Sequence, residues 1–332
     1  MIINAKTVFI NHYVTKIMMS LPDFKEKQAL FISTNESDIN KIRFLNDNIC
    51  FTIDDQIENQ ISCHKIFALF IIGDCSLTTP LIRNAQKYGI SIFLMNRNFQ
   101  AYASLISKAE GNYLLRQKQY QASEQEEFKK AQKLMSNKIQ NQITLLRSIN
   151  LESKNLTKLE QKIENISSPN DLLGTEGVAS RIFFKNYFSK IGWHKRTPQA
   201  KIDPINILMD IGYTFLFNFI DGMIGIYGFD SYKGFYHKLF FQRKSLSCDL
   251  MEPFRCLIDK QILKAYHLKQ VNEKDFKVLQ GNYRMDIKKR DKYLEILATA
   301  IMKNKEDIFC YVRDYYYHVM NKTEFPTFKI KK

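Results

Sequence analysis

SCDLMEPFR, residues 247–255, places two carboxylates, Asp249 and Glu252, three residues apart and just ahead of a proline. Proline is tolerated in the first turn of a helix, so we expect a helix to begin close to Pro253, with an apolar stripe along residues 257–263. Side chains three residues apart lie on one face of a helix, which lets both carboxylates point the same way. Two negative charges that close repel each other unless a cation lies between them.

Two further potential ligands precede this stretch. His237 lies twelve residues before Asp249, and Glu176 stands in the glycine-flanked run Gly174-Thr175-Glu176-Gly177. A histidine with two or three carboxylates is a ligand set suited to Mn²⁺ or Mg²⁺. The sequence therefore suggests a site for a divalent metal.

Each of these residues also has an ordinary structural role open to it. Asp249 is of a type that caps helix N-termini, and Glu252 is placed to complement the helix dipole from the first turn. His237 alone is typical of a satisfied or surface histidine, and Glu176 alone is typical of an acid early in a helix. The interpretation as a metal site depends on all four occurring together.

The joint pattern resembles one family, the CRISPR-associated integrase or "Cas one" family, which is the catalytic subunit of the spacer-acquisition complex. Four motifs occur in the order and spacing of that family: Gly174-x-Glu176-Gly177, Asp203-Pro204-x-Asn206, Gly234-Phe235-x-His237 and Ser245 to Arg255. Two more stretches are similar to its N-terminal strand-to-helix junction and its linker helix: Gly73 to Leu81, and Leu114-Leu115-Arg116-x-x-Gln119. The match spans roughly residues 60–265.

The resemblance implies an enzyme that acts on DNA phosphodiesters. It assigns Glu176, His237 and Asp249 to a catalytic metal-binding triad and Glu252 to an accessory acid, with Mg²⁺ or Mn²⁺ as the cofactor. The metal would offset the charge that builds on the attacked phosphate and on the leaving oxygen. The nucleophile would be the 3′-hydroxyl of a captured double-stranded DNA fragment, which attacks a phosphate at the edge of a CRISPR repeat. Water in place of that hydroxyl would turn the same site into a nuclease.

Basic residues cluster around the candidate acids. Lys238, Arg243 and Lys244 lie between the histidine and the Asp-x-x-Glu pair, and Arg255 follows that pair. Charges this close to a metal site usually position phosphates, so we expect all four residues to bind the DNA backbone. A solvated surface without a fixed partner is the alternative, and for Lys238 the two interpretations are nearly equal.

Composition bounds the class of protein. The chain has 332 residues, enough for two domains, and 45% of them are hydrophobic, which supports buried cores. Its formal net charge of +15 favours a polyanionic partner, either nucleic acid or an acidic membrane surface, although a lysine-rich proteome would produce the same excess. Six cysteines are scattered without a CxxC pair, which favours reduced thiols and a cytoplasmic location.

No stretch has the features of a membrane segment. The first residues lead into mixed polar sequence, without the charged and apolar regions of a signal peptide. The most apolar stretch, 205–229, is interrupted by Asp210, Asn218 and Asp221, whereas about 20 uninterrupted apolar residues are needed to cross a bilayer. We therefore expect a buried helical hairpin over 205–229 and no membrane partner.

The predicted fold is α+β. Short β-branched or aromatic runs predict strands at 7–10, 29–32, 66–72, 90–95 and 102–105, with one helix over 80–88. Residues 114–165 are rich in Gln, Lys, Glu and Leu and predict long helices, and further helices are expected at about 172–190, 204–222, 250–268 and 288–320. We expect a small β-rich N-terminal dimerisation domain, 1–108, followed by a larger all-α catalytic domain, 109–332, as the resemblance also implies.

The resemblance further implies a homodimer formed through the N-terminal domain. Two such dimers would be bridged by a small ferredoxin-like adaptation subunit into a hetero-oligomer. Two other functions stay open: a stand-alone metal-dependent DNA nuclease, and a non-catalytic DNA-binding scaffold in which the acids are structural. The sequence has no Walker A loop, no HExxH and no dinucleotide fingerprint, so ATP, zinc-protease and NAD chemistry have no support.

Overall fold

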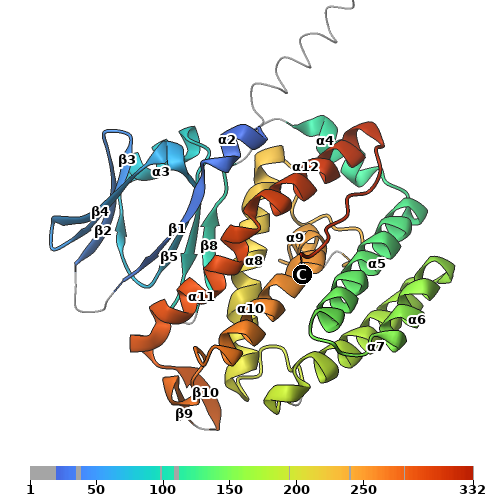
Figure 1. The fold of residues 1–332 in the computed structure, drawn as a ribbon. Helices are drawn as coiled ribbons and strands as arrows, with labels where there is room; N and C mark the ends of the chain where they lie inside the picture. The colour runs from blue at the N-terminus through green and yellow to red at the C-terminus, as the bar shows by residue number, and fades with distance from the viewer. Residues whose placement is uncertain are drawn as a thin grey trace, which may run out of the picture.

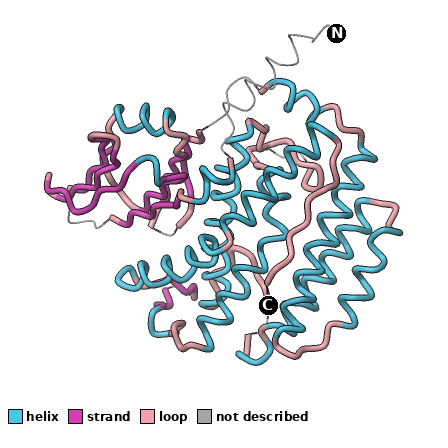
Figure 2. The backbone as a smooth tube through the Cα atoms, turned by 45° about the horizontal axis from the view of Figure 1, so that its top comes forward, coloured by secondary structure: helices cyan, strands magenta, loops and turns pink. Residues whose placement is uncertain are grey.

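Most strands lie in one part of the molecule and most helices in the other (Figures 1 and 2). The computed structural model describes residues 20–34, 39–97, 99–107, 112–193, 195–238, 241–279 and 281–331. The predicted strand 7–10 lies outside these residues, and so does the predicted boundary between residues 108 and 109. The predicted α+β class is confirmed: a β-rich region over residues 28–105 is followed by a mainly helical one.

The described elements of the first part are α2 (Leu21–Lys25), β1 (Gln28–Ser33), β2 (Asn40–Leu45), β3 (Asn48–Ile53), β4 (Gln56–Ser62), β5 (Ile66–Ile72), β6 (Ser76–Leu77), α3 (Thr79–Lys87), β7 (Ser91–Met95) and β8 (Ala101–Leu105). The second part comprises α4 (Tyr113–Tyr120), α5 (Glu124–Ser148), α6 (Lys154–Lys162), α7 (Pro169–Tyr187), α8 (Pro204–Tyr227), α9 (Ser245–Met251), α10 (Arg255–His267), β9 (Phe276–Leu279), β10 (Asn282–Met285), α11 (Arg290–Lys303) and α12 (Lys305–Asn321).

Two four-stranded sheets form the β-rich part. One has the order β1-β5-β7-β8, in which β1, β5 and β7 run parallel, and the other has the order β4-β3-β2-β6. Every residue of β5 is buried, because parallel strands flank it and both of its faces are covered. Leu69 and Ile71 belong to the core shared with the second sheet, whereas Phe67 and Phe70 belong to the core shared with the helices.

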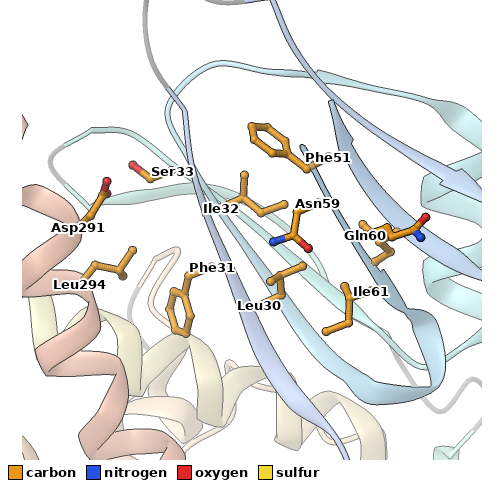
Figure 3. Close-up of a pocket in the computed structure, with 11 residues that line it drawn as sticks. Leu30, Phe31, Ile32, Ser33, Phe51, Asn59, Gln60, Ile61, Asp291 and Leu294 are labelled. Atoms are coloured by element: carbon orange, nitrogen blue, oxygen red, sulfur yellow. The ribbon is translucent and has the colours of Figure 1, made fainter. Parts of the chain in front are cut away.

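The β-rich part packs directly against the helices. Phe67 lies 5.5 Å from Phe219 of α8 and Phe70 lies 6.2 Å from Phe215, measured between ring centroids. A cavity of about 330 Å³ between β1, β3, β4 and α11 is lined from both parts of the chain, with Ile32 on one side and Leu294 on the other (Figure 3). The first sheet therefore shares one core with the helices and a separate core with the second sheet.

Helix α8 corrects one prediction. The expected hairpin over 205–229 is wrong, because residues 204–227 form a single helix through the middle of the helical part (Figure 1). Its polar residues do not mark a turn: Asn218 donates to Thr214 O at 2.9 Å, and Asp221 is held by partners from another element. Gly225 allows close packing instead, since a Cβ there would lie 2.2 Å from Ile106 Cγ2.

Among the described helices, α8 is also the one long and apolar enough to span a membrane. However, 83% of its most apolar stretch is buried inside the protein. Such burial is the property of a core helix.

The other differences concern short elements. Strands β2, β3 and β4 and the hairpin β9–β10 were not predicted, and the helix expected over 288–320 is divided into α11 and α12 at Asn304. A helix does begin after Pro253, as expected, but α9 precedes it and ends at Met251, so a 3₁₀ turn at Glu252–Phe254 joins the two helices. This junction positions both acids of the opening motif.

The C-terminal segment returns to this junction. After α12 the chain runs back toward α9 (Figure 1). Two asparagine side chains of α5 form hydrogen bonds with the backbone of this returning segment. Asn137 donates to Phe328 O at 2.8 Å and accepts from Phe328 N at 2.9 Å, while Asn141 accepts from Ile330 N at 3.0 Å. Asn141 also donates to Pro253 O at 3.1 Å, so the segment, α5 and the junction are bonded together.

Candidate active site

Two of the candidate acids, Glu176 and Glu252, lie against the ammonium group of a lysine that the sequence analysis did not single out. Lys138 of α5 places Nζ 2.5 Å from Glu176 Oε1 and 2.7 Å from Glu252 Oε2. Glu176 comes from α7, and Glu252 comes from the 3₁₀ turn between α9 and α10. The side chains of Lys138 and Glu252 are 9% and 3% exposed, so these charges interact with little water to screen them.

A second cation lies beside Glu252. Arg255 Nε is 3.1 Å from Glu252 Oε1, and the guanidinium stacks 4.7 Å from the ring centroid of Tyr213. Burial alone would raise the pKa of Glu252, but Arg255 and Lys138 outweigh burial and lower this pKa to about 2. Burial alone would lower the pKa of Lys138, whereas Glu252 and Glu176 raise it. Both partners therefore stay charged at neutral pH.

The second oxygen of Glu176 is held by Tyr236. The Tyr236 hydroxyl donates to Glu176 Oε2 at 2.5 Å. Burial and the neighbouring Glu176 carboxylate raise the pKa of this phenol well above its ordinary value. A phenol that keeps its proton is a permanent donor, so Tyr236 ties Glu176 to the loop that carries His237.

Asp249 anchors this loop from the last turn of α9, where its side chain is fully buried. Its Oδ2 accepts from the backbone N–H groups of Phe235 at 2.7 Å and Tyr236 at 3.0 Å. Its Oδ1 accepts from His237 N at 3.0 Å and lies 2.6 Å from His237 Nδ1. Gly234 makes this approach possible, because a Cβ there would lie 2.6 Å from Asp249 Oδ2. A carboxylate only accepts, so Nδ1 carries a proton, and in a neutral imidazole Nε2 is then the accepting nitrogen of His237.

The structure thus brings the predicted site residues together in two groups. Glu176 and Glu252 share Lys138, while His237 and Asp249 are bonded to each other. Asp249 and Glu252 were expected to point the same way, but they face different partners because the α-helix ends between them. The alternative that Asp249 is a helix N-cap is wrong, because Asp249 lies near the C-terminal end of α9.

The fit of a divalent cation follows from these contacts. Among the described residues, no three Asp, Glu, His or Cys side chains converge closely enough to hold a metal as the chain stands. Both oxygens of Asp249 already accept two contacts each. By contrast, Glu176 and Glu252 already enclose one positive charge, and carboxylates with an imidazole suit Mg²⁺ or Mn²⁺. The donor types of these residues suit a divalent cation, and Glu252 rather than Asp249 is the acid that faces Glu176.

The predicted DNA-binding residues occupy different environments. Lys238 and Arg243 are exposed beside the 235–237 loop and α9. Lys244 places its Nζ 2.6 Å from Oδ2 of the fully buried Asp221, so its charge stabilises the fold. Arg255 forms an ion pair with Glu252 at the edge of a large cleft. The exposed pair is therefore better placed for phosphates than Lys244.

Sequence reasoning missed Lys138 and Tyr236, although α5 carries a signal. Its buried side chains include Asn137, Lys138 and Asn141 next to leucine and methionine. Polar and charged residues on the apolar face of a helix need buried partners. That pattern would have pointed to α5 as part of a site.

The Asp-Pro-x-Asn motif has a structural role. Asp203 caps α8 by accepting from Asn206 N at 2.8 Å. Asn206 donates to Lys195 O at 3.1 Å, and the indole of the buried Trp193 donates to Asp203 at 3.1 Å. The motif therefore fixes the entry to α8.

Comparison with known proteins identifies the class. A model of the family described as CRISPR associated protein Cas1 matches residues 31–298. The chain therefore belongs to the Cas1 family, as the sequence motifs predicted. It is 28% identical over 253 residues to the CRISPR-associated endonuclease Cas1 1 of Thermodesulfovibrio yellowstonii, a match that covers 71% of this chain and 80% of that protein.

Solved structures share the fold. A Cas1 protein from Thermotoga maritima matches with a TM-score of 0.79 at 18% identity, covering 91% of this chain and 100% of that one. A casposase bound to integration product matches with a TM-score of 0.78 at 19% identity, covering 92% and 95%. A chain of a Cas6-RT-Cas1–Cas2 complex matches with a TM-score of 0.77 at 24% identity, covering 92% of this chain and 36% of that one.

Proposed function

We propose that this Cas1-family chain joins DNA fragments to a CRISPR repeat by strand transfer and cleaves DNA when water is the nucleophile. The observation that carries the proposal is the pair Glu176 and Glu252. Their carboxylate oxygens lie 2.5 and 2.7 Å from the same cationic nitrogen, Nζ of Lys138. A related protein is named as an endonuclease, and a casposase of the same fold is bound to integration product. These names support the same chemistry here.

The reaction exchanges one phosphodiester for another. The 3′-hydroxyl oxygen of the incoming strand forms a bond to phosphorus, the bond from that phosphorus to the 3′-oxygen of the nucleotide flanking the repeat breaks, and the proton passes from the attacking hydroxyl to the leaving oxygen. Because one bond of the same kind replaces another, no external energy source is required. Exposed Lys238 and Arg243 would bind the phosphates of the incoming strand.

Mg²⁺ or Mn²⁺ is the proposed cofactor, held by Glu176, Glu252 and His237 Nε2. When bound, it would neutralise the charge that builds on the reacting phosphate. Asp249 would be a positioning residue, since it bonds three backbone N–H groups of the loop and fixes the tautomer of His237. Tyr236 would hold Glu176 in place. This assignment exchanges the roles first given to Asp249 and Glu252.

The direct test is a strand-transfer assay with the purified chain, a small partner subunit and a repeat-bearing plasmid. Glu176→Gln should abolish joining, and a melting curve of the variant measures how much stability the lost ion pair with Lys138 costs. DNA cleavage without joining would favour the stand-alone nuclease. Full activity in EDTA, or in Glu176→Gln, would overturn the proposed chemistry and favour the scaffold.

We further propose that the chain works as a homodimer formed through its β-rich part. A small ferredoxin-like subunit would bridge two such dimers, and the assembly would bind double-stranded DNA. The shared fold with a chain of a Cas6-RT-Cas1–Cas2 complex supports such a partner. Integration at two sites also needs more than one active centre. Light scattering is the test, and a 39.2 kDa monomer unchanged by partner and DNA would refute this assembly.

A further inference from the structure

The segment after α12, residues 323–331, lies extended against the helical core, and we call it the C-terminal strap. Phe328 and Ile330 are buried, whereas the residues on either side of each are exposed. Side chains alternate in this way along an extended chain, so one face of the strap is apolar. The strap lies beyond the residues that the family model matches, which end at 298. Its contacts in this chain therefore define what it does.

The first contact is with the loop that carries His237. The ring of Phe325 lies 5.7 Å from that of Phe235, edge to face and measured between centroids. Phe235 stands two residues before His237 in the 235–237 loop. The same ring of Phe325 lies 6.0 Å from Tyr315 of α12. Phe325 therefore packs this loop against α12.

The second contact is with the turn that carries Glu252. The ring of Phe328 lies 4.4 Å from that of Phe254, the last residue of the 3₁₀ turn that begins at Glu252. Asn141 of α5 donates to Phe328 O at 3.0 Å and to Pro253 O at 3.1 Å. One amide group thus joins the strap to the turn.

The third contact is with α5 beside the candidate acids. Asn137 donates to Phe328 O at 2.8 Å and accepts from Phe328 N at 2.9 Å. Its side chain is 2% exposed, and a buried amide needs such partners. The next residue is Lys138, whose ammonium contacts Glu176 and Glu252. The strap therefore touches all three elements that surround this pair of acids and His237 apart from α7.

The spacing of the site depends on segments without long-range backbone bonding of their own. His237 comes from a loop and Glu252 from a single 3₁₀ turn, and such segments open more readily than long helices or sheets. Two ligands of one cation must nevertheless be held to a fraction of an ångström. Phe325 and Phe328 are three residues apart, roughly 10 Å along an extended chain. Pro326 between them restricts the backbone, so this distance is well defined.

We propose that the C-terminal strap positions the active site, with Phe325 and Phe328 setting the spacing between the loop of His237 and the turn of Glu252. The inference deepens the proposed function and rests on it for the cation that these two residues share. Both phenylalanines act through the segments that they hold, since their rings pack on other phenylalanines rather than on a ligand. Their loss should weaken metal binding and turnover and leave DNA affinity unchanged.

The test compares two double variants of the full chain. Phe325→Leu/Phe328→Leu keeps the strap apolar and removes both ring contacts. The matched control, Phe24→Leu/Phe309→Leu, removes another buried ring pair, stacked at 4.5 Å where α2 packs on α12. Melting temperatures should fall in both variants, so stability alone does not distinguish them.

Metal affinity and turnover distinguish the two variants. We expect the strap variant to bind Mn²⁺ about tenfold more weakly by isothermal titration calorimetry, the usual effect of losing an outer contact of a metal site. Its kcat for strand transfer should fall by about the same factor, while duplex affinity in EDTA stays at the wild-type value. The control should keep all three. Mn²⁺ affinity and kcat in the strap variant equal to those of the control would overturn the proposal.

Amide hydrogen exchange in EDTA tests the positioning without metal or DNA. Phe325→Leu alone should speed exchange in residues 235–237, Phe328→Leu alone should speed it in residues 252–254, and neither should affect β5. Unchanged exchange in both segments, or an equal increase throughout the chain, would contradict the role of the strap. A wild-type chain that binds no Mn²⁺ and joins no DNA would instead refute the proposed function, and faster exchange confined to these segments would still support the strap.

Discussion

The ammonium group of Lys138 lies 2.7 Å from Glu252 Oε2, inside the protein and beside a second carboxylate. A buried carboxylate needs a compensating charge, and this lysine supplies it to both acids at once. The candidate active site therefore holds an internal cation at the place proposed for a divalent metal. The first prediction follows from this arrangement.

Lys138→Met should leave Glu176 without its ammonium partner and the buried Glu252 with Arg255 as its remaining cation. We expect the free energy of unfolding in EDTA to fall by about 3–5 kcal/mol, the usual cost of breaking a buried pair. Mn²⁺ should restore part of this loss and raise the melting temperature more in the variant than in the wild type, as measured by thermal unfolding with and without metal. Lys133→Met, exposed on the same helix, is the control and should stay within about 0.5 kcal/mol. An unchanged melting temperature in EDTA would mean that Lys138 does not compensate these acids.

Asp249→Asn and Glu252→Gln should separate positioning from cation binding. Asp249→Asn places an amide donor where backbone N–H groups converge, so it should lower the melting temperature as well as strand transfer. Glu252→Gln should abolish strand transfer and Mn²⁺ binding, measured by isothermal titration calorimetry, and should also lower stability because Lys138 and Arg255 lose a buried partner. The reverse result, Mn²⁺ binding lost in Asp249→Asn and kept in Glu252→Gln, would restore the original triad of Glu176, His237 and Asp249.

Lys244 and Arg243 are adjacent in sequence and should behave differently. Lys244→Met leaves Asp221 buried with one remaining partner, Ser247, and should cost about 3 kcal/mol in unfolding free energy. Arg243→Met removes an exposed charge and should leave unfolding unchanged while reducing the salt slope of duplex binding by about 1. Urea unfolding and binding titrations at several salt concentrations measure the two effects. Equal unfolding free energies of the two variants would contradict the assignment of Lys244 to folding and Arg243 to DNA binding.

Stability should depend on pH through Asp259. Burial raises the pKa of this carboxyl from 3.8 to about 7, although Tyr213, which donates to it at 2.5 Å, opposes the shift. The folded state therefore binds more protons than the unfolded state between about pH 4 and 7, and the contribution of Asp259 to stability is lost as pH rises through 7. Asp259→Asn keeps the acceptor for Tyr213 and should be more stable than the wild type at pH 8, by roughly 1–3 kcal/mol.

The check on this pH dependence is a series of melting curves from pH 5 to 8. The difference in melting temperature between Asp259→Asn and wild type should grow with pH. Glu295→Gln, an exposed substitution on α11, should follow the wild-type profile. A constant difference would show that Asp259 is ionised in the folded protein throughout this range.

The local sequence predicted helices and strands correctly where the residue composition of a segment favoured one of the two. The apolar run at 66–72 became the buried central strand β5, and the polar-rich residues 114–165 became α4, α5 and α6. The prediction failed at 205–229, where Asn218 and Asp221 resembled interruptions. Their side chains are bonded to Thr214 and Lys244 in the fold, and a polar residue with a partner does not break a helix.

By itself, the sequence determined the family, the α+β class and which acids and basic residues gather near the candidate site, because motifs and helix periods are local properties of the chain. Only the tertiary structure decided what each of them contacts. It placed Lys138 of α5 between Glu176 and Glu252, used Asp249 to anchor the 235–237 loop, and paired Lys244 with buried Asp221. Charges interact over a few ångströms in a medium of low dielectric constant, so their roles depend on distances between segments far apart in sequence, and packing alone sets those distances.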